Sequence, residues 1–144
     1  MIADPICDLL AADANVTADL ATFDFGAGAS AAIFDFAPAP LDCPQPLITV
    51  TEEGGPWTGT RDTRGFRMRG EITIWGNKGR TRRVLRRIAM YAFRAIDRQH
   101  LTLESPYCEV GVHCDAWNET TDREGFPGIR IPFDAIVLEG SGAP

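Results

Sequence analysis

Arginine side chains form the densest group of chemically active residues in the sequence. Residues 76–99 contain seven arginines and one lysine, and their spacing is typical of one face of a helix. The guanidinium group of arginine forms paired hydrogen bonds with phosphate or carboxylate oxygens. This segment could therefore bind nucleic acid, or it could pair with acidic residues of a protein.

Acidic residues are concentrated in a different part of the chain. Residues 1–60 contain nine acidic residues and no Lys or Arg, whereas residues 61–144 hold all 14 basic residues and 11 acidic ones. The formal net charge is −6, but stand-alone nucleic-acid-binding domains are usually basic overall. We therefore favour pairing of the arginines with acids of this chain or of a neighbouring copy. A solvated helix face and contact with nucleic acid are the alternatives.

Complementary patches of this kind predict an interface between subunits or with a partner protein. Trp57, in the turn-rich segment GGPWTGTRDTRG, is either a core residue or an interface anchor. The other candidate interface residues are all charged: Arg61, Arg64, Arg80, Arg82, Arg83, Arg86, Arg87, Arg94, Asp13, Asp19 and Asp24.

Catalytic groups are sparse in this sequence. The two histidines, His100 and His113, are expected just past a helix end and on the polar face of a strand. The GxSxG, HExxH and GxxxxGK[ST] motifs do not occur. The segment FGAGAS runs into an apolar stretch, whereas a phosphate-binding loop leads into a helix. We expect no catalytic residue and no cofactor, so an enzyme has the least support.

Metal-ligating residue types also lack a characteristic spacing. The four cysteines form no CxxC pair. Alternation in YCEVGVHCDAW places five small or apolar residues on one strand face: Cys108, Val110, Val112, Cys114 and Ala116. We expect the cysteines to be small buried side chains rather than metal ligands or disulfide partners. The acids of WNETTDREG are expected in a solvated loop rather than at a Ca²⁺ site, because the EF-hand spacing is absent.

The elements that position these residues follow from periodicity and turn signals. A helix is predicted over residues 3–13, with Asp4 as its cap and Pro5 in its first turn. Strands are predicted in AAIFDFAPAP, PLITVTEE and FRMRGEITIWG, with VTADLATFDFGAGAS mostly a loop and GGPWTGTRDTRG a loop. In FRMRGEITIWG, one face carries Phe66, Met68, Ile72 and Ile74, and the other carries Arg67, Arg69, Glu71, Thr73 and Trp75.

The basic segment is predicted as a helix over about residues 79–98. Its apolar stripe consists of Val84, Leu85, Ile88, Ala92, Ala95 and Ile96, with Ala89 and Phe93 at the margins. One or two strands follow within residues 101–122. IRIPFDAIVLE is the closing strand, with Ile131, Phe133 and Val137 facing inward.

This order of elements predicts an α+β fold in a single domain, residues 1–144. Strands in consecutive blocks indicate a mostly antiparallel β-sheet, with one long amphipathic helix packed on it and a short N-terminal helix. No apolar run approaches the roughly 20 residues that a membrane span needs, and the N-terminus lacks a basic secretory region. We therefore expect a soluble, unsecreted protein without a membrane partner.

Several segments in a fixed order carry a resemblance to a known family. DPICDLLAADANVTADL opens the chain, and AAIFDFAPAP, PLITVTEEGGPW, TRDTRG and FRMRGEITIWG come next. One long helix, EVGVHCDAWNETTD and a final strand follow. In this order the chain resembles the tail-terminator proteins of long-tailed bacteriophages and gene-transfer particles over nearly its whole length. The strongly arginine-rich helix departs from the family pattern.

The resemblance implies a structural role in the tail or neck of a virion. Tail terminators look like hexameric rings that cap the tail tube, stop its polymerisation and contact the head-completion or stopper protein. DNA passes through the channel without sequence-specific binding. A closed ring joins one patch of each subunit to a different patch of the next. The alternatives are another neck or connector ring protein, and a nucleic-acid-binding module that uses residues 79–98.

Overall fold

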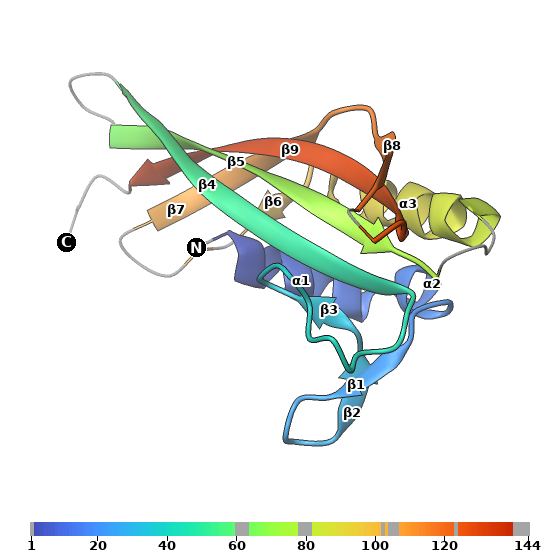
Figure 1. Ribbon diagram of the computed structural model, residues 1–144. Helices are drawn as coiled ribbons and strands as arrows, with labels where there is room; N and C mark the ends of the chain where they lie inside the picture. Colours follow the sequence, from blue (N-terminus) through green and yellow to red (C-terminus); the bar gives the residue numbers. More distant parts are fainter. Residues whose placement is uncertain are drawn as a thin grey trace.

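The computed structural model describes residues 2–59, 64–77, 82–101, 103, 107–122 and 124–139. Figure 1 shows a twisted sheet with helices packed against one face and a small hairpin that projects from the body. Within the described residues the elements are α1 (Ala3–Ala12), α2 (Ala14–Thr17), β1 (Thr22–Asp24), β2 (Ala29–Ala31), β3 (Ile33–Phe34), β4 (Leu47–Gly59), β5 (Arg64–Trp75), α3 (Arg82–Ile96), β6 (His100–Leu101), β7 (Tyr107–Cys114), β8 (Asn118–Thr121) and β9 (Pro127–Glu139).

The main sheet has the strand order β3-β4-β5-β9-β7-β6, and β8 pairs with the first part of β9. β3 pairs with β4 in parallel, whereas β4–β5, β5–β9, β9–β7 and β7–β6 are antiparallel. β1 and β2 form a separate antiparallel hairpin. The predicted α+β class with a mostly antiparallel sheet is confirmed. None of the described helices is long and apolar enough to span a lipid bilayer.

The core lies between the sheet and the two helices α1 and α3. As predicted, the inner face of the sheet includes Met68, Ile72, Ile74, Ile131, Phe133 and Val137, all buried. Arg67, Arg69 and Glu71 lie on the outer face, where they reach water. Thr73 was expected on the exposed side, but it is 8% exposed because it lines a cleft between residues 37–47 and β8. Alternation therefore predicted which face each residue occupies, but not how much of the outer face is covered.

The close packing of β5 against its neighbours β4 and β9 depends on Gly70. Gly70 of β5 pairs with Phe133 of β9. A Cβ atom at Gly70 would lie 2.1 Å from the backbone oxygen of Thr51 and 2.5 Å from Cζ of Phe133. The ring of Phe133 therefore occupies the space that any other residue at position 70 would need.

The start of α1 is held by a residue from β4. Oε2 of Glu52 accepts hydrogen bonds from the backbone N–H of Ile2 at 2.7 Å and of Ala3 at 3.1 Å. The predicted cap, Asp4, is wrong: the N-cap position is Ile2, without a side-chain cap of its own, and Asp4 lies within the first turn. A carboxylate from the sheet thus satisfies N–H groups that a helix leaves unpaired at its start.

Two segments expected as loops contain regular structure. Within residues 14–31 lie α2, whose cap is Asp13, and the hairpin of β1 and β2. The segment GGPWTGTRDTRG is largely strand, because β4 continues to Gly59 and β5 begins at Arg64, with a register shift between Gly54 and Trp57. Glycine and turn residues here accompany a β-bulge within a long hairpin.

The long helix and the following strand are shorter than predicted. α3 ends at Ile96, two residues before the expected end, and residues 78–81 lie outside the described part of the chain. β7 ends at Cys114, so Ala116, expected on the inner face, is exposed in the connection to β8. Val112 and Cys114 are buried as predicted.

Candidate interaction surface

The arginine-rich helix is held on the sheet by its apolar face. α3 packs on β5, β7 and β9. Leu85, Ile88, Ala92 and Ile96 are buried as predicted, Ala89 is also fully buried, and Val84 and Ala95 are half-buried. The buried side of the helix is therefore shifted toward Ala89 and away from Val84 and Ala95, relative to the prediction. The arginines still lie on the opposite side of the helix.

Glu119 of β8 pairs with two arginines of α3. Nη1 of Arg82 donates to Oε2 of Glu119 at 2.9 Å, and Nε of Arg86 donates to Oε1 at 2.7 Å. The hydrogen bond from Arg86 is the largest cause that lowers the pKa of the Glu119 carboxyl, and the charges of both arginines add to it. Glu119 lies in a strand, where a solvated loop was expected, and part of the arginine charge is neutralised within one chain.

Arg87 pairs with a carboxylate from the acidic first part of the chain. Nε of Arg87 donates to Oδ2 of Asp19 at 2.8 Å. This contact links α3 to the segment that follows α2. One acid of residues 1–60 thus pairs with an arginine of the basic helix within the same chain.

Arg83 and Arg94 are exposed on α3. Among the described residues neither forms an ion pair. Positions 83, 87 and 94 fall on one side of a helix, because their spacing of four and seven residues returns to the same face. Two arginines of this stripe thus keep their charge uncompensated on either side of the Arg87–Asp19 pair.

Asp13 and Asp24, two other predicted interface residues, stabilise the local backbone rather than pair with α3. Asp13 accepts hydrogen bonds from the N–H of Asn15 and Val16 as the cap of α2, and Asp24 accepts one from Gly26 in the β1–β2 turn. Trp57 belongs to β4 and Arg64 to β5, and the backbone of Trp57 lies opposite that of Phe66 in the strand register. Arg61 and Arg80 lie outside the described residues.

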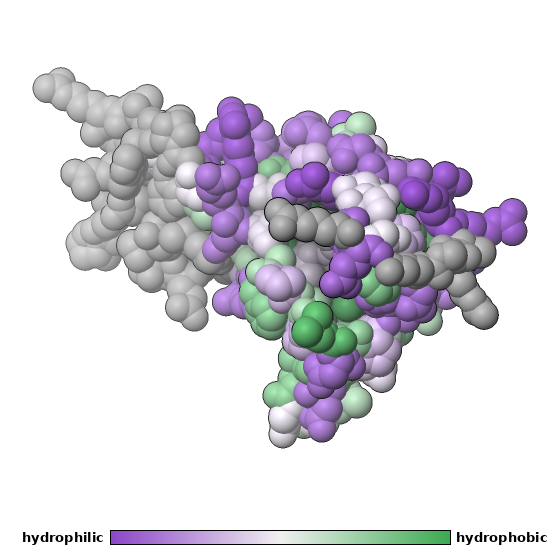
Figure 2. Space-filling model, in the orientation of Figure 1, coloured by the Kyte–Doolittle hydropathy of each residue, from purple (hydrophilic) through white to green (hydrophobic). Residues whose placement is uncertain are grey.

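A cluster of four phenylalanines, which periodicity did not reveal, surrounds the β1–β2 hairpin. We call residues 22–36 the aromatic arm. The ring centroids of Phe23, Phe25, Phe34 and Phe36 lie 5.1 to 5.5 Å from their neighbours. Phe34 is buried, but Phe25 and Phe36 are 47% and 49% exposed. Figure 2 shows hydrophobic and hydrophilic surface side by side on this projection.

A second exposed aromatic contact lies beside α3. Phe93 of α3 meets Trp117, in the connection between β7 and β8, edge to face at a centroid distance of 5.9 Å. Trp117 is 38% exposed. Phe93 lies on the same side of the helix as Arg82 and Arg86, so this apolar contact is flanked by arginines.

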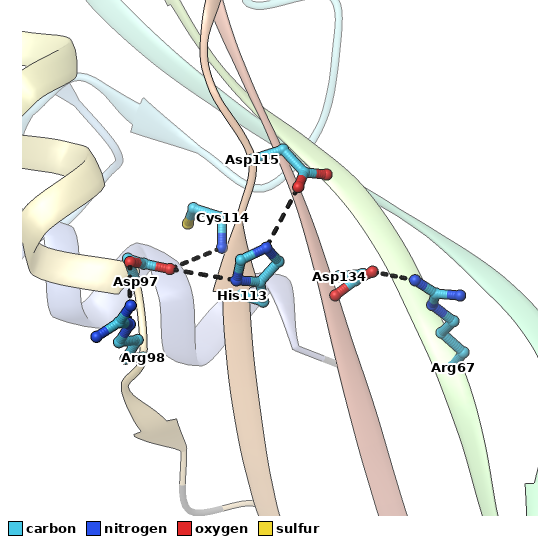
Figure 3. A network of polar contacts seen from close by, with 7 residues as sticks. All are labelled: Arg67, Asp97, Arg98, His113, Cys114, Asp115 and Asp134. Atoms are coloured by element: carbon cyan, nitrogen blue, oxygen red, sulfur yellow. Dashed lines mark hydrogen bonds and ion pairs between the residues drawn. The ribbon is translucent and has the colours of Figure 1, made fainter.

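The end of α3 is fixed to β7 by Asp97. Oδ1 of Asp97 accepts a hydrogen bond from the N–H of Cys114 at 2.9 Å and lies 3.8 Å from Nδ1 of His113 (Figure 3). Nε2 of His113 lies 3.3 Å from Asp115, and Arg67 pairs with Asp134 on the neighbouring strands. His113 is exposed on the polar side of the strand, as predicted. The contacts of Asp97 connect the helix end to β7, and the Arg67–Asp134 pair lies beside them as a separate contact (Figure 3).

The described part of the outer face of the sheet includes two hollows. One, of about 620 Å³, is lined by side chains of both charge signs, including Glu53, Arg69 and Asp134. The other, of about 710 Å³, has a more apolar lining that includes Pro38 and Trp75. Within the described ranges, no group of three or more His, Cys, Asp or Glu side chains is arranged to hold a metal ion.

Comparison with known proteins gives a likeness in fold. No protein-family model matches the chain, and no curated protein matches it in sequence. A solved structure does resemble it: a chain from the virion of a native gene transfer agent (GTA) particle. The chain shares this fold. The TM-score is 0.71, and the match covers 95% of this chain and 94% of the virion chain at 15% sequence identity.

Proposed function

We propose that this protein is a structural virion protein, and specifically a ring-forming tail terminator. The supporting observation is the likeness in fold, over nearly the full length of both chains, to a chain of a gene transfer agent virion. The segment order of the sequence supports the same proposal independently. The protein is not an enzyme under this proposal, and it acts in the tail or neck of the particle.

The proposed mechanism is geometric. A ring of copies, six in the family pattern, binds the last ring of the tail tube with one face. Its other face accepts the head-completion or stopper protein but not a further tail-tube subunit, so tube growth stops. DNA passes through the channel without sequence-specific binding.

The charge distribution supports a heterologous ring. The helix α3 contains five arginines and no acidic residue, and three of these arginines pair with only two carboxylates, those of Glu119 and Asp19. The first part of the chain is acidic. In a ring, the acidic first part of one copy would then meet the basic helix of the next, which joins unlike parts of successive subunits.

Deletion of the gene in the producing strain tests the proposal. We expect electron microscopy to show tail tubes of unregulated length that are not joined to heads, and a plasmid copy of the gene to restore normal particles. Tails of normal length joined to heads would contradict the proposal.

A different neck or connector ring protein is the second candidate, because likeness to a virion chain supports a place in the particle without naming the position. In that case the deletion leaves tails of normal length, and heads that look full but carry no tail. Gold-labelled antibody against the protein separates the two by its position at the end of isolated tails or on isolated heads. A DNA mobility shift that disappears in Arg83→Glu/Arg94→Glu would instead favour a nucleic-acid-binding module.

A further inference from the structure

The aromatic arm and helix α3 have complementary surfaces. We propose that the aromatic arm of one copy docks on α3 of the next copy, with Phe25 and Phe36 against the Phe93–Trp117 contact. This inference rests on the proposed ring and names the two surfaces through which its neighbouring subunits touch.

The arm presents apolar side chains that are already in position. The ring of Phe34, which is buried, lies 5.3 Å from the ring of Phe25 and 5.5 Å from that of Phe36. Stacking on a buried ring restricts both exposed rings before any partner arrives, so docking loses little side-chain entropy. Aromatic side chains of this kind carry a large share of the binding energy at protein interfaces.

The receiving surface offers a matching apolar contact. The Phe93–Trp117 pair is an edge-to-face aromatic contact that is partly open to water. A further aromatic ring placed on it extends the same edge-to-face packing and removes apolar surface of both copies from water. The arm and the receiving surface therefore both present aromatic rings at their centres.

Charge complementarity selects α3 as the partner surface. The aromatic arm contains Asp24 and Asp35 and no basic residue, whereas α3 contains only basic charges. Arg83 and Arg94 have no ion pair among the described residues, and they lie with Arg87 on the stripe next to the side of the helix that carries Phe93, about 100° around the helix axis. The Arg87–Asp19 contact at 2.8 Å shows that a carboxylate of the acidic first part fits this stripe.

The position of the two surfaces favours contact between copies. In Figure 1 the hairpin of the arm projects below the body, while α3 lies along its upper right. A contact between two unlike surfaces leaves a free arm on one copy and a free α3 on the other, so it repeats around a ring until the ring closes.

Photo-crosslinking tests the contact directly. The photoreactive amino acid p-benzoylphenylalanine is placed at position 25, and the purified full chain is irradiated at low ionic strength and high concentration. We expect covalent dimers, with mass spectrometry mapping the crosslinks to residues 86–98 or 115–119 of the other copy. The same amino acid at position 136, which is 54% exposed on β9, is the control and should give no crosslink to these peptides. Crosslinks from position 25 to another surface, or none, would overturn the proposal.

Sedimentation equilibrium supplies a second measurement. Phe25→Ser and Arg94→Glu should each weaken self-association at least about tenfold, the size of a hot-spot truncation. The matched controls, Ile136→Ser and Arg69→Glu, should leave it unchanged, and circular dichroism should show that all four variants fold. Equal weakening by the controls, or a wild-type protein that stays monomeric at the highest attainable concentration, would overturn the proposal.

Failure of this inference is distinguishable from failure of the proposed function. Overlong tails in the deletion strain, together with crosslinks that avoid α3, would remove only the arm contact. Crosslinks to α3 together with normal tails in the deletion strain would keep the contact and remove the terminator function.

Discussion

Arg86 of α3 and Glu119 of β8 are 33 residues apart in the chain, and Nε of Arg86 donates a hydrogen bond to Oε1 of Glu119 at 2.7 Å. Arg82 takes the other carboxylate oxygen of the same residue. A single carboxylate on β8 therefore pairs with two of the five arginines of α3. This pairing has a consequence for the dependence of stability on pH.

Glu119→Gln should lower the melting temperature slightly at pH 7. The effect is small because the ion pairs are solvent-exposed. Since the pKa of Glu119 is lowered in the folded protein, its stabilisation is present above the ordinary carboxyl pKa and is lost as pH falls through the lowered pKa. The difference in melting temperature between variant and wild type should therefore shrink below about pH 4.

Calorimetry between pH 7 and pH 3 measures this difference. Glu124→Gln is the matched control. Glu124 is an exposed acid in the connection between β8 and β9, and it has no ion pair among the described residues. A difference for Glu119→Gln that persists unchanged at pH 3 would argue against the ion-pair explanation.

Gly70→Ala should lower the free energy of unfolding by about 1–3 kcal/mol, as other overpacked cores do. The added methyl group meets the Thr51 backbone oxygen and the ring of Phe133, and the backbone oxygen cannot move away without disturbing the β4–β5 ladder. Urea denaturation gives the value. Gly111→Ala is the control, because a Cβ there meets no atom within 4 Å. An equal loss in the free energy of unfolding for Gly70→Ala and Gly111→Ala would show that the close contacts of Gly70 are not the cause of the destabilisation.

Glu52→Ala should destabilise the protein by about 1 kcal/mol, the usual loss when a helix cap is removed. The N–H groups of Ile2 and Ala3 would lose the carboxylate that now accepts from them. Glu53→Ala, one position along and exposed on the outer face, should change the free energy of unfolding by less than about 0.5 kcal/mol. Urea denaturation followed by circular dichroism compares the two. A cost for Glu53→Ala as large as that for Glu52→Ala would remove the special role of Glu52.

Cys7 and Cys114 should react slowly with thiol reagents in the folded protein. Burial raises the pKa of both thiols to about 12, with smaller contributions from Asp35 for Cys7 and from Asp97 for Cys114. At neutral pH the reactive thiolate is then on the order of a thousandfold scarcer than for a free cysteine. Iodoacetamide labelling followed by peptide mass spectrometry measures each site, with unfolded protein as the control. Labelling at the unfolded rate would contradict the predicted burial.

Local periodicity was sufficient for the parts of the fold whose neighbours lie close in sequence. Alternation in β5 and β9 predicted the buried positions Met68, Ile72, Ile131 and Val137, and the helical stripe predicted Leu85, Ile88 and Ile96. These patterns are readable because each repeats the geometric period of its own element. The arginine surface of α3 was identified for the same reason, since the arginines occupy the side of the helix opposite the apolar stripe.

The aromatic arm could not be predicted in this way. Its glycines and alanines show no hydrophobic period, and its aromatic cluster forms where Phe23 and Phe25 meet Phe34 from a different element. The strand character around Trp57 was missed for a related reason. Its glycines suggested a loop, whereas pairing with β5 keeps the segment extended beyond the bulge.

The sequence by itself determined the fold class, the apolar faces of the main elements and the separation of acidic from basic residues. Only the tertiary structure decided which charges meet. Glu119 pairs with both Arg82 and Arg86, and Asp19 pairs with Arg87, while Arg83 and Arg94 form no ion pair among the described residues. Glu52 accepts hydrogen bonds at the start of a helix 49 residues away. Composition and periodicity describe each element alone, but an ion pair or a cap depends on the distance between atoms that folding brings together.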